Sequence, residues 1–102
     1  MSLGLDGRTL DLLVSALSRE PTVHRAILFG SRAKGTAKPG SDIDLCLEGP
    51  DLGTPVLARL ETFLDDLLLP WEIDLVPRTD IDNPELLAHI DEFGIPIYER
   101  SA

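Results

Sequence analysis

Two aspartates, Asp42 and Asp44, open a segment that otherwise has the apolar character of a buried strand, Asp-Ile-Asp-Leu-Cys-Leu. Aspartate is uncommon in strands, and residues two apart on a strand point to the same face of the sheet. Two carboxylates held close together repel each other unless a positive charge lies between them. The pattern therefore predicts a strand with an acidic face, and a divalent metal ion is the simplest partner for that face.

A second apolar segment, residues 24–29, precedes these aspartates and predicts another buried strand. Gly30 and Ser31 follow it, and then a short segment punctuated by Gly and Pro, which is typical of a turn between two strands. Three basic residues and no acidic residue occur between positions 32 and 38. On a chain with a formal net charge of −9, this local positive patch favours a small anionic ligand, and we expect no direct nucleic-acid binding.

Helix caps, prolines and apolar spacing predict the remaining elements. We expect helices from Thr9 to before Pro21, from Thr54 to before Pro70, and from Asn83 to 93. In the second of these helices the apolar stripe extends through Leu67 and Leu68, and Gly94 is expected to take the left-handed conformation after the last helix. Further strands are expected over residues 71–76 and 95–98, the latter at a sheet edge because it contains a proline.

This alternation predicts an α/β two-layer fold in one domain spanning residues 1–102: a small mixed sheet of three to four strands with helices covering one face. If the helices cover the face that carries the apolar strand residues, then Asp42, Asp44 and Asp74 all emerge on the opposite face. Asp74 lies in the strand Glu-Ile-Asp-Leu-Val. The sequence therefore predicts three carboxylates on one face of the sheet.

Carboxylate oxygens suit Mg²⁺, which is usually held by one or two carboxylates together with substrate phosphates. Two such ions about 4 Å apart can clamp the attacking and leaving oxygens of a phosphoryl transfer. If Ser31 opens a short helix, its backbone N–H groups face an anion, and Gly30 lets a phosphate approach the backbone closely. Arg32 and Lys34 are candidates for neutralising further phosphate charge. The alternative is that the aspartates only prevent edge aggregation and that the basic residues are simply solvated.

Composition limits the cellular setting of the protein. No apolar run approaches the roughly 20 residues that span a bilayer, and no signal peptide is recognisable. One cysteine, Cys46, permits no disulfide within the chain, and we interpret it as a buried apolar thiol. His24 and His89 lack metal-ligand partners at zinc spacing and are interpreted as structural or surface residues. We therefore expect a cytoplasmic protein that does not bind membranes.

Segments 30–35, Gly-Ser-Arg-Ala-Lys-Gly, and 41–45, Ser-Asp-Ile-Asp-Leu, together resemble the Gly-Ser…Asp-X-Asp signature of the polymerase-beta-like nucleotidyltransferase superfamily. The short length and the Arg-Ala-Lys-Gly continuation look most like its minimal nucleotidyltransferases, called MNT proteins. The resemblance implies that Gly30 and Ser31 hold the triphosphate of ATP. It also implies that Asp42 and Asp44 bind Mg²⁺ and that Asp74 completes the metal site and activates the acceptor hydroxyl.

The same resemblance implies a Mg²⁺-dependent transfer of AMP from ATP to a hydroxyl group. In HEPN/MNT toxin–antitoxin modules the acceptor is a tyrosine of a helical HEPN-type toxin, so this chain would act as the antitoxin. Two alternatives remain open: a nucleotidyltransferase that modifies a small molecule such as an aminoglycoside, and a non-catalytic module that neutralises a partner by contact alone. Assembly as a homo-oligomer or hetero-oligomer is left open as well.

Overall fold

The computed structural model describes residues 5–36, 40 and 42–100. Its elements, in chain order, are α1 (Gly7–Ser18), β1 (Arg25–Phe29), α2 (Ser31–Lys34), β2 (Ile43–Glu48), α3 (Thr54–Asp65), β3 (Ile73–Pro77), the 3₁₀ helix η1 (Arg78–Asp80), α4 (Pro84–Phe93) and β4 (Ile95–Glu99). Within the part of the chain that is described, no helix has the length and apolar character needed to cross a membrane.

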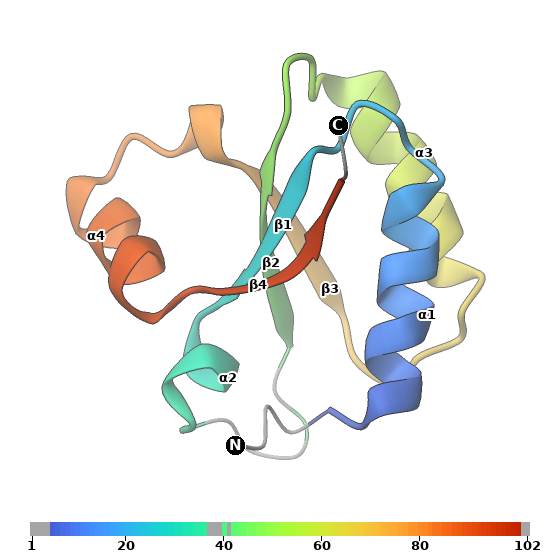
Figure 1. Ribbon diagram of the computed structural model, residues 1–102, viewed down its shortest axis with the longest axis horizontal. Coiled ribbons are helices and arrows are strands. Elements are labelled where there is room, and N and C mark those ends of the chain that lie inside the picture. Colours follow the sequence, from blue (N-terminus) through green and yellow to red (C-terminus); the bar gives the residue numbers. More distant parts are fainter. Residues whose placement is uncertain (1–4, 37–39, 41, 101–102) are drawn as a thin grey trace.

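The four strands form one mixed sheet in the order β3-β2-β1-β4. β1 pairs antiparallel with β2 and with β4, and β2 pairs parallel with β3 (Figure 1). The predicted mixed sheet is therefore confirmed, with β4 at an edge as the proline in its sequence required. Because β1 and β2 are central, their alternating side chains are covered on both faces, which explains why they read as almost continuous apolar runs.

One face of the sheet packs against α1 and α3, which lie side by side in Figure 1. The largest fully buried side chains lie in this layer. They come from α1 (Leu13, Leu17), the strands (Leu28, Ile43, Leu45, Leu47) and α3 (Leu60). The period-2 alternation of β2 is thus as predicted: its odd-numbered residues enter the core and Asp44 points to the other face.

Helices were expected on one face of the sheet only. The second face is nevertheless partly covered. α4 lies across part of it (Figure 1), and a smaller cluster of buried side chains fills the space between them. That cluster contains Ile27, Phe29 and Cys46 from the sheet, and Ile81 and Ile90 from the segment that carries α4. Helix α4 therefore closes one part of the face that also carries the candidate aspartates.

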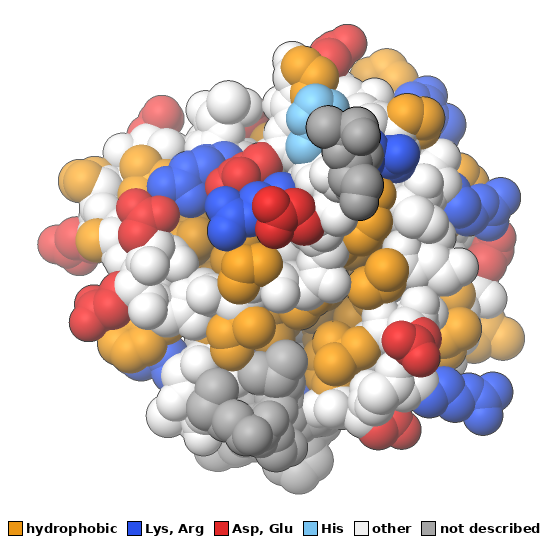
Figure 2. Space-filling model, viewed as in Figure 1, with side chains coloured by type: hydrophobic (Ala, Val, Ile, Leu, Met, Phe, Trp, Pro, Cys, Tyr) orange, Lys and Arg blue, Asp and Glu red, His pale blue; other side chains and the backbone are white. Residues whose placement is uncertain are grey.

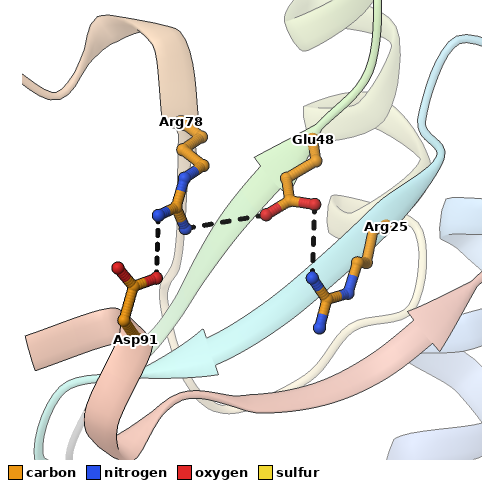
Figure 3. Close-up of polar contacts among 4 residues, drawn as sticks. All are labelled: Arg25, Glu48, Arg78 and Asp91. Atoms are coloured by element: carbon orange, nitrogen blue, oxygen red, sulfur yellow. Dashed lines mark hydrogen bonds and ion pairs between the residues drawn. The ribbon is translucent and has the colours of Figure 1, made fainter. Parts of the chain in front are cut away.

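Ion pairs attach α4 to the sheet at the rim of this cluster. Basic and acidic side chains lie against one another near η1 in Figure 2, and Figure 3 shows four of them. Arg78 pairs with Asp91 of α4 (2.7 Å between Nη2 and Oδ1) and with Glu48 of β2 (3.6 Å), while Glu48 also accepts from Arg25 of β1 (3.4 Å). The chain of contacts links α4, η1 and two central strands.

Several element boundaries differ from the sequence-based prediction for local reasons. Helix α1 begins before Thr9, because the Asp6 carboxylate accepts the Thr9 backbone N–H (2.8 Å) and serves as the cap. Helix α3 begins at Thr54, with Gly53 at its cap position, and ends at Asp65 rather than near Pro70. The predicted apolar stripe is wrong at Leu68, which has a positive φ of 55° and is 88% exposed. The chain reverses there, so this leucine points into solvent.

Gly94 also differs from the prediction, because its φ of −60° is not left-handed. The glycine is required by packing instead. A Cβ at this position would lie 2.6 Å from Cγ2 of Ile27 and would also collide with the Ile90 carbonyl oxygen. Gly94 thus lets the end of α4 lie close to β1.

We expect Gly94→Ala to lower the free energy of unfolding by about 1–3 kcal/mol, because the new methyl group must displace both the β1 side chain and the helix carbonyl. Gly7→Ala is the matched control, since a Cβ at Gly7 meets nothing within 4 Å. Urea unfolding of the three proteins measures the effect. Equal midpoints for wild type and Gly94→Ala would contradict the packing argument.

Candidate functional site

The sheet topology brings three of the predicted site residues to the same end of the molecule. In the antiparallel pair, Phe29 at the end of β1 lies opposite Asp44 near the start of β2. In the parallel pair, Asp44 lies opposite Asp74 near the start of β3. Gly30, the residue that follows β1, therefore lies beside Asp44, and Asp44 lies beside Asp74 of the next strand.

Gly30 lies against Asp44 so closely that a Cβ at Gly30 would collide with Oδ2 of Asp44. Its φ of 80° is also a conformation that residues with side chains rarely adopt. Ser31 then begins the four-residue helix α2, as predicted, and is half-buried at its first position. Gly35 ends α2 in the left-handed conformation. The turn and the aspartate thus form one compact unit.

Burial raises the pKa of the Asp44 carboxyl above its ordinary value. The negative charge of Asp74 and a hydrogen bond shared with it raise the pKa further, and Asp42 adds a smaller effect. Arg32 opposes these effects. The ionised form of Asp44 is therefore destabilised in the free protein, and a cation placed beside it would be favoured.

Asp42 lies just before β2 and is exposed, and Asp74 is exposed at the edge strand. Among residues 5–36, 40 and 42–100, no three His, Cys, Asp or Glu side chains stand close enough to bind a metal ion together. The paired carboxylates of Asp44 and Asp74 nevertheless fit the donor set of Mg²⁺, which commonly takes one or two carboxylates and completes its shell with substrate phosphates and water. The metal site of Asp42, Asp44 and Asp74 stays a prediction.

The two predicted basic residues lie in different environments. Arg32 is only 2% exposed; its Nε donates to the Asp42 carbonyl oxygen (3.3 Å), and its guanidinium lies 5.3 Å from the centre of the Trp71 ring. Lys34 is exposed, and its Nζ lies 5.4 Å from the Phe93 ring of α4. Arg32 is thus a buried cation that braces the start of β2, and phosphate contact by either residue stays a prediction. Ser41 lies outside the described residues.

Sequence reasoning missed the part that His89 plays beside this turn. Its Nε2 accepts the backbone N–H of Gly30 (3.0 Å). No local signal marks His89, because its partner is 59 positions away in the sequence.

Cys46 is fully buried and the burial raises the pKa of its thiol, in agreement with its interpretation as an apolar residue.

A cavity of about 490 Å³ opens beside Asp74. Leu69, Trp71 and Ile73 supply apolar walls, and Glu61 and Asp65 of α3 supply acidic ones. Asp74 is therefore accessible from the β3 edge of the sheet. A ligand that bound in this cavity would lie next to Asp74.

Comparison with known proteins finds a matching family model. The family model described as a nucleotidyltransferase domain matches residues 10–95. A search of curated proteins finds no match.

Solved structures with the same fold include toxin–antitoxin complexes. One, a toxin–antitoxin with AMP-PNP, has a TM-score of 0.72 and 23% identity, over 90% of this chain and 74% of the other. The tri-AMPylated Shewanella oneidensis HEPN toxin in complex with MNT antitoxin gives a TM-score of 0.67 and 20% identity, over 91% and 71% of the two chains. The toxin–antitoxin MntA-HepT gives a TM-score of 0.68 and 20% identity, over 93% and 74%. These similarities establish the shared fold.

We expect Asp44→Asn to stabilise the metal-free protein, and to do so more strongly as the pH rises. The folded state raises the Asp44 pKa above 3.8, so it holds this proton more tightly than the unfolded chain does. Stability is therefore lost as the pH rises through the folded pKa, and the amide variant avoids that loss. Thermal unfolding in chelator between about pH 4 and about pH 7 should show a growing difference. Asp80→Asn, at an exposed carboxylate of η1, is the control; a constant difference across the range would contradict the expectation.

Proposed function

We propose that this chain, which belongs to the nucleotidyltransferase domain family, transfers AMP from ATP to a hydroxyl group of a HEPN-type toxin and so acts as the antitoxin of a toxin–antitoxin pair. The observation that carries the proposal is the arrangement of Asp44 and Asp74 side by side, with the Gly30 backbone packed against Asp44. The likeness to toxin–antitoxin structures, one of them with AMP-PNP and one with a tri-AMPylated toxin, supports the choice of nucleotide and acceptor.

In the proposed reaction, Gly30 and Ser31 hold the triphosphate at the start of α2, where backbone N–H groups favour an anion. Asp44 and Asp74, joined by Asp42, would hold Mg²⁺. When bound, Mg²⁺ supplies positive charge that offsets the phosphate charge and stabilises the leaving oxygen. The raised pKa of Asp44 in the free protein fits this assignment, because a cation relieves the crowding of like charges.

The acceptor hydroxyl would reach the α-phosphorus through the cavity beside Asp74. The acceptor oxygen forms a bond to the α-phosphorus, the bond to the bridging oxygen breaks, and pyrophosphate leaves with that electron pair. Asp74 takes the acceptor proton, since its exposed carboxylate lies at the cavity wall. Within one small domain the cavity stays open, so a protein partner would supply its missing wall. The need for ATP places the proposed reaction in the cytoplasm.

The direct test is incubation with Mg²⁺, α-labelled ATP and the protein encoded beside this gene, followed by intact-mass measurement of that partner. We expect the partner to gain one or more AMP units. Asp44→Asn and Asp74→Asn should each lower the rate by about a hundredfold or more, because phosphoryl transfer depends on positioned charge. Asp80→Asn is the control and should keep the wild-type rate, since it lies in η1 beyond the far end of β3.

Two other outcomes would redirect the assignment. Transfer to a small hydroxylated molecule without any partner would favour an enzyme that modifies small molecules. A partner that binds tightly, stays unlabelled and is still neutralised by Asp74→Asn would favour a module that acts by contact alone.

Added Mg²⁺ should raise the thermal midpoint of the wild-type protein near neutral pH. It should have a smaller effect on Asp44→Asn, which lacks one of the proposed ligands. Differential scanning fluorimetry with Mg²⁺ titrated into chelated protein measures this. Equal Mg²⁺ responses in the two proteins would remove Asp44 from the proposed metal site.

A further inference from the structure

Helix α4 reaches the turn that follows β1 through one side chain, His89. The backbone N–H of Gly30 donates to Nε2 of His89 over 3.0 Å. A histidine nitrogen accepts a hydrogen bond only where it carries no proton, so this contact requires the neutral ring with its proton on Nδ1. The bond joins helix α4 to the turn that lies against Asp44.

Aromatic packing holds the His89 ring in place. Phe29, the last residue of β1, meets it edge-on with ring centres 6.3 Å apart and planes 73° apart. Phe93, one helical turn later in α4, lies 5.5 Å from it, and Lys34 of α2 lies over the ring of Phe93. The ring is thus clamped by β1 and α4 and has little freedom to turn away from Gly30.

The position of α4 along the sheet is fixed separately. Asp91, two residues after His89, pairs with Arg78 at 2.7 Å, and Arg78 pairs with Glu48 of β2 (Figure 3). Gly94 fits against Ile27 of β1 where no side chain has room. These contacts hold α4 so that His89 lies next to the Gly30 turn. They are separate from the hydrogen bond between the two residues.

We propose that His89 is a positioning residue for nucleotide binding, acting through the backbone of Gly30. The inference rests on the proposed function, in which Gly30 and Ser31 hold the triphosphate. Glycine has more accessible backbone conformations than any other residue. Gly30, with its φ of 80°, therefore gains order when its N–H has a fixed acceptor. A turn already ordered in the free protein loses less freedom when ATP binds.

The proposal is tested with three substitutions of His89. His89→Gln keeps an acceptor oxygen near the position of Nε2, His89→Phe keeps an aromatic ring between Phe29 and Phe93 but has no acceptor, and His89→Leu keeps neither. The control is His24→Leu, at an exposed histidine before β1. The readouts are Mg²⁺–ATP binding by calorimetry, KM and kcat for AMP transfer, the amide resonance of Gly30, and the thermal midpoint.

We expect His89→Phe and His89→Leu to raise the Kd and KM for ATP about three- to tenfold, the range of one lost hydrogen bond, with kcat within about twofold of wild type. The Gly30 amide proton should move upfield in both variants. His89→Gln should restore ATP affinity to within about twofold, and His24→Leu should match wild type. A nitrogen-detected histidine spectrum of the wild type should show the proton of His89 on Nδ1.

Unchanged ATP affinity in His89→Phe would overturn the inference, because the ring alone would then suffice. Equal losses in His89→Gln and His89→Phe would overturn it as well, since the acceptor would have no role. The binding measurement needs no acceptor, so it separates this inference from the proposed function. Wild-type protein that binds ATP but transfers nothing would contradict the proposed function alone, whereas wild-type protein that does not bind ATP would overturn both.

Discussion

The close contact between the Gly30 backbone and the Asp44 carboxylate organises the candidate site. The antiparallel register of β1 and β2 places Phe29 opposite Asp44, so Gly30, the residue after β1, packs directly against the acidic side chain. No side chain fits between them, and the positive φ at Gly30 independently favours glycine. The turn into α2 and the carboxylate face are therefore held together by backbone geometry, which is more rigid than a contact between two long side chains.

This arrangement has an electrostatic cost in the free protein. Asp44 is half-buried beside Asp74, and both burial and like charge disfavour its ionised form. Arg32, which is almost fully buried and donates to the Asp42 carbonyl oxygen, relieves part of that cost through its positive charge. An acidic pair retained in such an environment is typical of functional sites rather than of stabilising ones. The same physics makes the pair attractive to a cation and links the metal and nucleotide parts of the proposal.

Helix α4 divides the second face of the sheet into a packed part and an open part. Ile81, Ile90 and Cys46 bury apolar surface beneath it, and this burial contributes more to its attachment than the partly exposed ion pairs at the rim. Asp44 and Asp74 are not among the side chains of this cluster, and Asp74 lines the cavity at the β3 edge. The helix thus serves as a wall of the candidate site, with His89 at the point of contact.

Local patterns in the sequence determined the strands, the face on which Asp44 and Asp74 emerge, the Pro84 helix start and the glycine turn, because side-chain alternation and caps depend on residues a few positions apart. They also carried the family signature. The tertiary structure alone decided that α4 covers part of the second face, that Arg32 turns inward, that Leu68 points outward and that His89 meets Gly30. Each of these depends on which distant surfaces pack together, and period and composition along the chain do not encode that packing. The sequence by itself therefore specified the acidic face and the turn beside it, while the tertiary structure set the wall, the burial and the hydrogen bond that give the site its shape.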